Sequence, residues 1–146
     1  MTRKGLLIYW SPVILWMGFI FWMSSETFSA DETSSRLVPV LNLLMPGITA
    51  EGIETIHSII RKLGHISEYF VLGLLLFRAF YGTNVNPEVY RCMVYSLIVL
   101  AAYALSDEFH QSFVQTRTSS LADVGLDVAG GILSHAVIAV RRSLKR

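Results

Sequence analysis

The stretch HISEYFVLGLLLF, residues 65–77, sets two ionisable side chains, His65 and Glu68, directly before an apolar run. Two later apolar runs show the same feature, because Asp107 follows the run 93–105 and Asp127 lies early in the run 121–140. Charged groups inside membrane segments are unfavourable and rarely face lipid. The sequence therefore predicts helices that turn these side chains toward one another.

The overall composition favours a membrane protein. Of 146 residues, 53% are apolar and 16% are charged, whereas soluble domains average about 25% charged residues. This length fits a single domain that spans residues 1–146. The net charge is +1, and no basic run with interleaved aromatic residues indicates nucleic-acid binding. The single cysteine, Cys92, cannot form an internal disulfide.

Four segments are long and apolar enough to be transmembrane helices, at about 6–23, 58–81, 91–114 and 120–140. The first is rich in Trp and is not followed by an Ala-x-Ala site, which favours an uncleaved anchor over a signal peptide. We predict an all-α, four-helix transmembrane bundle.

Short extra helices are expected in the first outer loop. Ser29 and Glu32 have the spacing of a capping box, which marks the start of a helix. Thr49 is a candidate N-cap for a further helix that continues into the second span.

The positions of Lys and Arg predict the orientation in the membrane. Cations lie near the N-terminus, between the second and third spans, and at the C-terminus. They are Arg3, Lys4, Arg78, Arg91, Arg141, Arg142, Lys145 and Arg146. Four crossings place these three regions on one side, and the positive-inside rule makes that side cytoplasmic. Both termini are therefore predicted to be cytoplasmic.

Carboxylates on three of the predicted helices fall at one depth. At 1.5 Å per residue, Glu68, Asp107 and Asp127 lie about 18–21 Å from the cytoplasmic ends of their helices. Further ionisable side chains are expected nearer the outer surface: His65, Glu108, His110, Asp123, Lys62 and Arg117. Three separate segments thus converge on a single polar layer.

A simpler interpretation is that these groups only hold the helices together. An interhelical hydrogen bond in a membrane contributes about 0.6–2 kcal/mol, whereas an acid near a helix centre costs about 2.5–3.5 kcal/mol. Since Ser or Asn would make a similar bond at lower cost, the magnitudes favour a functional site or a solvated cavity. In the cytoplasmic half, Arg78 and His135 are the main polar candidates, and snorkelling to the headgroups is their ordinary explanation.

Three motifs in order carry a family resemblance. They are RKLGHISEYFVLG at 61–73, SDEFHQ at 106–111, and RTSSLADV at 117–124, the last followed by Asp127 and by Gly130-Gly131. With these motifs the chain resembles the VanZ-like family of small bacterial integral membrane proteins. The resemblance covers nearly the whole chain.

The resemblance implies a multi-pass protein of the bacterial plasma membrane with a role in the cell envelope. The founding member of the family is linked with reduced susceptibility to the glycopeptide teicoplanin, so an antibiotic-resistance context is implied rather than a reaction. Two positions differ from the common pattern. Gln115-Thr116 stands where the family often has Pro-Gly, and Asp127 stands where Asn is common.

The leading hypothesis is a membrane-embedded enzyme that acts from the outer side on a lipid-linked or lipid-anchored envelope substrate. The buried acids would share a proton, and His65 or His110 would act as general base. The candidate catalytic residues are His65, Glu68, Asp107, Glu108, His110, Asp123 and Asp127. Lys62 and Arg117 would bind phosphate at headgroup level. The candidate substrate-binding residues are Lys62, Tyr69, Gln111 and Arg117.

Other hypotheses stay open, including whether the protein is an enzyme at all. Ser67 and Ser106 are conceivable nucleophiles, but lone serines in membrane helices more often bond to the preceding turn. A non-enzymatic subunit would bind a lipid headgroup or a glycopeptide, and a proton or ion pathway would use the acids as relays. A metal centre is a lower-weight variant. Its ligands would be His65, His110, Glu68, Asp107 and Asp123.

Overall fold

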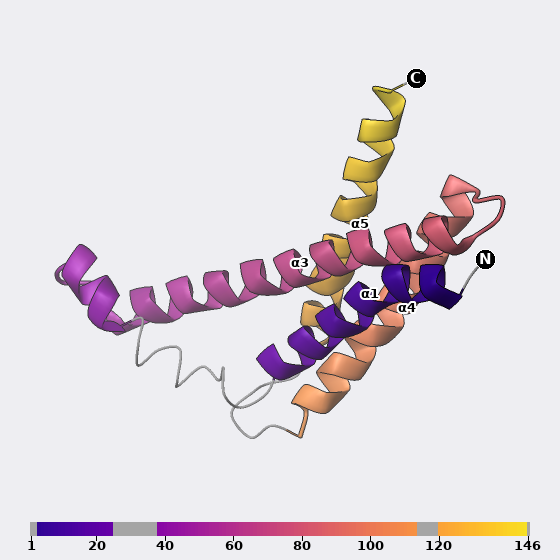
Figure 1. Ribbon diagram of the computed structural model, residues 1–146. Coiled ribbons are helices and arrows are strands. Elements are labelled where there is room, and N and C mark those ends of the chain that lie inside the picture. The colour runs from indigo at the N-terminus through magenta and orange to yellow at the C-terminus, as the bar shows by residue number, and fades with distance from the viewer. Residues whose placement is uncertain (1–2, 25–37, 114–119, 146) are drawn as a thin grey trace.

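The computed structural model describes residues 3–24, 38–113 and 120–145, and these residues form helices joined by turns. The long helices are α1 (Arg3–Met23), α3 (Ala50–Thr83), α4 (Val89–Gln111) and α5 (Leu121–Ser143), shown in Figure 1. Residues 38–44 form a further short helix, whereas the capping-box residues Ser29 and Glu32 lie outside the described part of the chain. The all-helical prediction is confirmed, and all four long helices are long and apolar enough to cross a membrane.

The starts of α3 and α5 follow local capping chemistry. The Thr49 hydroxyl accepts a hydrogen bond from the Gly52 amide at 3.2 Å, as the sequence predicted. The Ser120 hydroxyl accepts one from the Ala122 amide at 3.1 Å. Each bond satisfies a backbone donor that has no partner inside its helix.

The α3 helix is much longer than a membrane span. It runs for 34 residues without interruption, or about 51 Å, whereas the hydrocarbon core of a bilayer is about 30 Å thick. Its N-terminal part therefore extends beyond the other helices, as Figure 1 shows.

The direction of the helices follows from their side-chain contacts. Along α3 and α5, Arg61 pairs with Asp123 and His65 pairs with Asp127, both at a sequence separation of 62. Because the separation is constant, α3 and α5 run in the same direction. At the other end of α3, an Arg142 guanidinium nitrogen donates to the Tyr81 hydroxyl at 3.0 Å, at a separation of 61.

The N-terminal end of α1 lies beside the C-terminal end of α3. The Trp10 and Phe80 rings are 5.2 Å apart, and the Arg78 guanidinium lies 5.1 Å from the centre of the Tyr9 ring. The start of α1, the turn between α3 and α4, and the end of α5 thus share one end of the bundle. This arrangement is the one that four alternating membrane crossings require.

Small residues allow α5 to pack closely in the bundle. A Cβ atom placed on Gly130 would lie 2.5 Å from the carbonyl oxygen of Ile66, and one on Gly131 would lie 2.6 Å from a Leu100 methyl carbon. Glycine is therefore required at position 130, where the neighbouring atoms are backbone, whereas at position 131 an added Cβ would require the Leu100 side chain to move.

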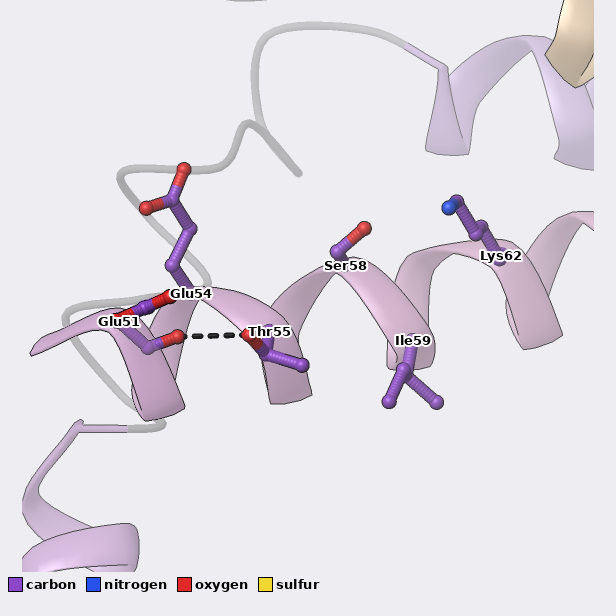
Figure 2. Close-up of a pocket in the computed structure, with 6 residues that line it drawn as sticks. All are labelled: Glu51, Glu54, Thr55, Ser58, Ile59 and Lys62. Carbon is purple, nitrogen blue, oxygen red and sulfur yellow. Dashed lines mark hydrogen bonds between the residues drawn. The ribbon is translucent and has the colours of Figure 1, made fainter. Parts of the chain in front are cut away.

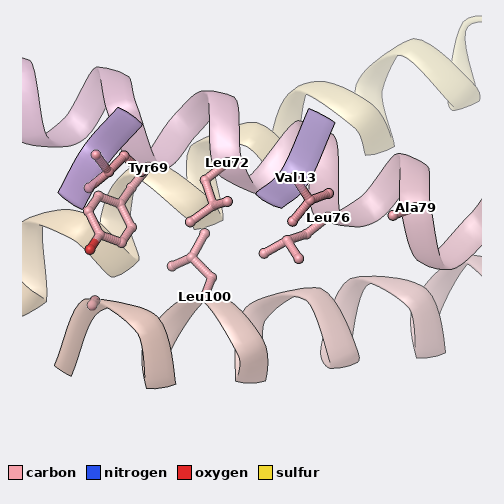
Figure 3. Close-up of a cluster of buried hydrophobic side chains, with 8 residues drawn as sticks. Val13, Tyr69, Leu72, Leu76, Ala79 and Leu100 are labelled. Atoms are coloured by element: carbon pink, nitrogen blue, oxygen red, sulfur yellow. The ribbon is translucent and has the colours of Figure 1, made fainter. Parts of the chain in front are cut away.

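An apolar layer fills the middle of the bundle. Leu72 and Leu76 of α3, with Leu100 and Ala104 of α4, are fully buried, and Val13 of α1 packs against them, as Figure 3 shows. Large apolar side chains also cover the outside, including Leu15, Ile98, Phe109 and Leu133. Several ionisable side chains, including His65, Asp107 and Asp127, lie inside instead, which is the reverse of the usual pattern in soluble proteins.

We predict that Gly130→Ala lowers the free energy of unfolding of the detergent-solubilised protein by about 1–3 kcal/mol, the usual range for overpacking. The added methyl group would meet backbone atoms of Ile66 and Phe70, which cannot move aside easily. The control is Gly125→Ala in the same helix, where an added Cβ has no neighbour within 4 Å. The control should be neutral or gain up to about 1 kcal/mol from helix propensity.

Both variants would be compared by thermal unfolding. Equal effects at the two positions would contradict the close crossing of α3 and α5.

Candidate functional site

The structure brings polar side chains of α3, α4 and α5, with that of the residue that follows α1, to one region of the bundle. This region lies beside the middle of α3, the N-terminal end of α5 and the C-terminal ends of α1 and α4. We call this region the polar layer. Its buried members are Ser24, His65, Asp107, Glu108, Gln111, Asp123 and Asp127. The structure thus brings together side chains from segments that are far apart in the sequence.

The most deeply buried ion pair of the polar layer joins His65 of α3 to Asp127 of α5. The distance from His65 Nδ1 to Asp127 Oδ1 is 2.9 Å, and the two residues are 6% and 0% exposed. The Asp side chain is short, so this contact depends on the close approach of the backbones at Gly130, one turn further along α5. Asp127 therefore fixes the orientation of the imidazole ring.

A second ion pair lies one helical turn nearer the start of both helices. An Arg61 guanidinium nitrogen donates to Asp123 Oδ2 at 3.2 Å, and the Asp123 carboxylate is 7% exposed. Arg61 was not among the predicted site residues, whereas its neighbour Lys62 was.

Lys62 points away from this contact. It is exposed, and it lines a shallow surface depression of about 330 Å³ on the projecting part of α3, shown in Figure 2.

Asp107 is the centre of a hydrogen-bonded group at the ends of α1 and α4. Its Oδ2 atom accepts from the Ser24 hydroxyl at 2.9 Å and from the Gln111 amide nitrogen at 3.0 Å. Asp107 and Gln111 stand one turn apart on α4, as expected for residues that share a helix face. Sequence reasoning did not assign Ser24 to the site. Its position directly after the first apolar span was the signal that could have identified it.

Glu108 joins the end of α4 to the start of α5. Its Oε2 atom accepts from the Ser120 backbone amide at 2.7 Å, in the manner of a capping side chain. Its Oε1 atom is buried and has no hydrogen-bond partner among the described residues. One oxygen therefore has a structural contact, while the other is buried without one among the described residues.

Tyr69 lies at the base of the polar layer and is completely buried. Its hydroxyl has no hydrogen-bond partner in the part of the chain that the structure describes. It is close enough to interact electrostatically with both Asp107 and Asp127. Tyr69 stands one helical turn after His65 on α3, so its buried side chain lies beside the His65–Asp127 pair.

The remaining predicted site residues are placed as follows. Glu68 is half-buried and interacts electrostatically with His65 and Tyr69, while its backbone oxygen accepts from the Trp16 indole nitrogen at 2.9 Å. The His110 ring packs on Phe21 of α1, with ring centroids 4.2 Å apart. The predicted Arg117 lies outside the described residues.

The snorkelling interpretation of His135 is wrong. This side chain is only 6% exposed, and its Nε2 atom lies 3.1 Å from the Ser96 hydroxyl. The face of α5 that carries His135 packs into the bundle, so the ring lies inside although it is near the C-terminal end of the helix. Arg78, by contrast, is exposed.

Two further sequence-based hypotheses can be compared with the geometry. Ser67 and Ser106 donate to the carbonyl oxygens of Leu63 and Tyr103 in their own preceding turns, so the ordinary interpretation of these serines is confirmed. Within the described ranges, no three His, Cys, Asp or Glu side chains are grouped so that they could hold a metal ion. The described part of the polar layer is therefore a hydrogen-bonded network of ion pairs and polar groups.

Comparison with known proteins identifies one family. A family model described as VanZ/LLP1 matches residues 9–142, a range that contains every described residue of the polar layer. Neither the curated proteins nor the solved structures gave a match.

We predict that His65 and Asp127 are energetically coupled. A double-mutant cycle with His65→Ala and Asp127→Ala should give a coupling free energy of about 1 kcal/mol or more, because each single change leaves a buried polar group without its partner. The control cycle uses Glu88 and Arg91, an exposed pair on α4 with a 2.9 Å contact, for which about 0.5 kcal/mol or less is expected.

Both cycles would be measured by unfolding in detergent. Coupling of His65 with Asp127 no larger than that of the exposed pair would show that the buried contact is not maintained in solution.

Proposed function

The chain belongs to the VanZ/LLP1 family, and we propose that its polar layer is an acid–base site acting on a lipid-linked or lipid-anchored substrate of the bacterial cell envelope. Family membership and four apolar helices make it a multi-pass membrane protein. We also propose that this membrane is the bacterial plasma membrane. The observation that carries the proposal is the completely buried carboxylate of Asp127 in contact with the His65 imidazole.

His65 is the proposed general base, and Asp127 is its orienting partner. A carboxylate on one ring nitrogen holds an imidazole in a defined orientation and tautomer, which is the arrangement that proton-transfer sites use. With Nδ1 in contact with Asp127, Nε2 is the nitrogen that would take a proton from the substrate and return it. Imidazole suits this role because it changes protonation state near neutral pH.

The position of the apolar layer supports access of a substrate to the polar layer from one end of the bundle. Leu72, Leu76 and Leu100 are fully buried between the polar layer and the C-terminal end of α3, as Figure 3 shows. A substrate would therefore enter from the other end of the bundle, where α5 begins and α3 projects beyond it. With both termini in the cytoplasm, as the Lys and Arg positions predict, that end faces outward.

The same apolar layer disfavours a proton pathway. Asp127 and His135 are the two deeply buried ionisable residues of α5 beyond its first turn, and eight positions separate them, or about 12 Å along the helix. The fully buried Leu100 and the closely packed Gly131 lie at this level. The buried Ser134 hydroxyl near this level donates to the Gly131 carbonyl of its own helix. No ionisable side chain of α5 lies between Asp127 and His135, so a proton would have to cross about 12 Å between them.

The second candidate is a non-enzymatic subunit that binds a lipid headgroup or a glycopeptide. The carboxylates of the polar layer would then serve as counter-charges for the ligand. Both functions agree with the teicoplanin context of the family. They differ in whether proton exchange by His65 is required once the ligand is bound.

We predict that His65→Gln and Asp127→Ala abolish the effect of the protein on teicoplanin susceptibility in a bacterial strain in which the wild-type chain produces one. The first change removes the imidazole that exchanges protons, and the second removes the side chain that orients it. The measurement is the inhibitory concentration of teicoplanin at equal membrane levels of each variant.

The matched control is Glu88→Gln, since the Glu88 side chain is exposed on α4. This control should retain the wild-type effect. Full activity of both polar-layer variants would contradict the acid–base proposal. Glu68→Gln, Asp107→Asn and His110→Ala extend the same test to the other candidate residues.

A further inference from the structure

The end of the bundle opposite the polar layer has a strong excess of positive charge. The segments that form this end carry eight basic residues, namely Arg3, Lys4, Arg78, Arg91, Arg141, Arg142, Lys145 and Arg146. They carry one acidic residue, Glu88, whose carboxylate contacts the Arg91 guanidinium at 2.9 Å. No Asp or Glu occurs in residues 1–25, 69–87 or 128–146. The positive charge at this end is therefore not balanced by acidic side chains of the chain itself.

The guanidinium groups of Arg78 and Arg142 are held on tyrosine rings. Arg78 Cζ lies 5.1 Å from the centre of the Tyr9 ring, and Arg142 Cζ lies 4.6 Å from the centre of the Tyr81 ring. Arg142 also donates to the Tyr81 hydroxyl at 3.0 Å. Among the described residues, neither arginine forms an ion pair with a carboxylate. Aromatic side chains thus position both cations without neutralising them.

The two arginines flank one face of α3. Arg78 and Tyr81 are three positions apart on this helix, so their Cβ atoms are neighbours at about 5–6 Å. The Tyr9 ring approaches from α1 and also packs on Gly82, where an added Cβ atom would overlap it. Arg142 approaches the same face from α5 through its contact with Tyr81. The exposed Arg78 therefore lies between a side chain of α1 and a cation of α5.

Two ordinary interpretations do not account for Arg78. Basic residues in the last turn of a helix offset its dipole, which applies to Arg141 and Arg142 of α5, but α3 has no basic residue in its last turn. A snorkelling arginine reaches the headgroups with a flexible side chain, whereas the Tyr9 ring holds the Arg78 guanidinium in place. A cation that is already positioned loses less entropy when it binds a ligand. This arrangement favours a binding site for an anion.

The chemistry of the two cations selects a phosphate group. A guanidinium carries five N–H donors in its plane and no acceptor, so a ring contact through its face leaves donors at its edge for an anion. Phosphate oxygens match this pattern, because they accept two parallel N–H bonds from one guanidinium. At the end of a membrane span, basic pockets between helices are suited to the phosphate groups of anionic lipids.

We propose that the Arg78 and Arg142 guanidinium groups bind the phosphate of an anionic phospholipid. A lipid fits better than free phosphate because exposed apolar side chains lie at the same level, including Leu6 of α1 and Val140 and Leu144 of α5. These side chains would contact the acyl chains. The site uses no residue of the polar layer, so it is independent of the proposed acid–base function.

The proposal is tested by lipid binding to the full-length chain, measured by native mass spectrometry in detergent. The probes are dioleoylphosphatidylglycerol and dioleoylphosphatidylcholine, which share their acyl chains and phosphate. The choline cation cancels the charge of the second lipid, whereas the glycerol headgroup leaves the first anionic. Because two cations act on the phosphate, we expect the anionic lipid to bind about tenfold tighter or more. Equal affinities would overturn the proposal.

The decisive comparison is between Arg78→Gln and the matched control Arg91→Gln. Each change removes one positive charge from the same end of the bundle, and both side chains are exposed, so folding should be retained. Arg78→Gln should lower the affinity for the anionic lipid about fivefold. The control should change it by less than about twofold, because Arg91 is already paired with Glu88. Equal losses would show attraction by bulk charge and would overturn the site.

Arg78→Lys separates a positioned guanidinium from a simple positive charge. Lysine keeps the charge but cannot form two parallel bonds to one phosphate. The affinity for the anionic lipid should therefore fall about threefold. An affinity equal to that of the wild-type chain would contradict the guanidinium–phosphate contact.

A competition experiment separates the two sources of phosphate. Inorganic phosphate that displaces dioleoylphosphatidylglycerol only at a much higher concentration supports a lipid ligand. Displacement at concentrations equal to those of the lipid would overturn the assignment to a lipid.

Discussion

A buried carboxylate is unfavourable unless a hydrogen-bond donor or a cation pairs with it. In this protein the pairing of two buried carboxylates determines how α3 and α5 cross. Asp127 reaches His65 at 2.9 Å, and Asp123 reaches Arg61 at 3.2 Å. The His65–Asp127 contact needs backbones that lie close together, because the Asp side chain is short, and glycine at position 130 allows this approach. The two pairs and the glycine contact thus specify the same register, since a slip of one residue would separate both pairs and press a side chain into the α3 backbone.

The polar layer is not explained by stability alone. Interhelical hydrogen bonds in membranes contribute about 0.6–2 kcal/mol, less than an acid near a helix centre costs. A layer selected only to hold helices together would satisfy every oxygen with neutral side chains. Here Glu108 and Asp127 each have one oxygen in contact with the protein and one without a partner among the described residues. Unsatisfied buried groups of this kind need an explanation other than helix packing.

The sequence predicted the features that are determined within a single segment of the chain. The four apolar helices and the Thr49 cap depend on local composition and spacing, and the convergence of the acids depends on helical rise. The sequence could not predict whether Arg61 or Lys62 would contact Asp123. The two side chains point about 100° apart on one helix, and only the register of α3 with α5 selects between them. The prediction that His135 snorkels to the headgroups was wrong for the same reason. Its environment is set by packing against α3 and α4.

The order of the two layers along the bundle connects the fold with the proposed chemistry. The apolar side chains of Leu72, Leu76 and Leu100 lie directly below the polar layer. They exclude water, so they strengthen the electrostatic interaction between His65 and Asp127 above them. They also separate the polar layer from the other end of the bundle. A single packed layer therefore both strengthens the ion pair and keeps the site closed on one side, which suits a site that exchanges protons with a ligand rather than across the membrane.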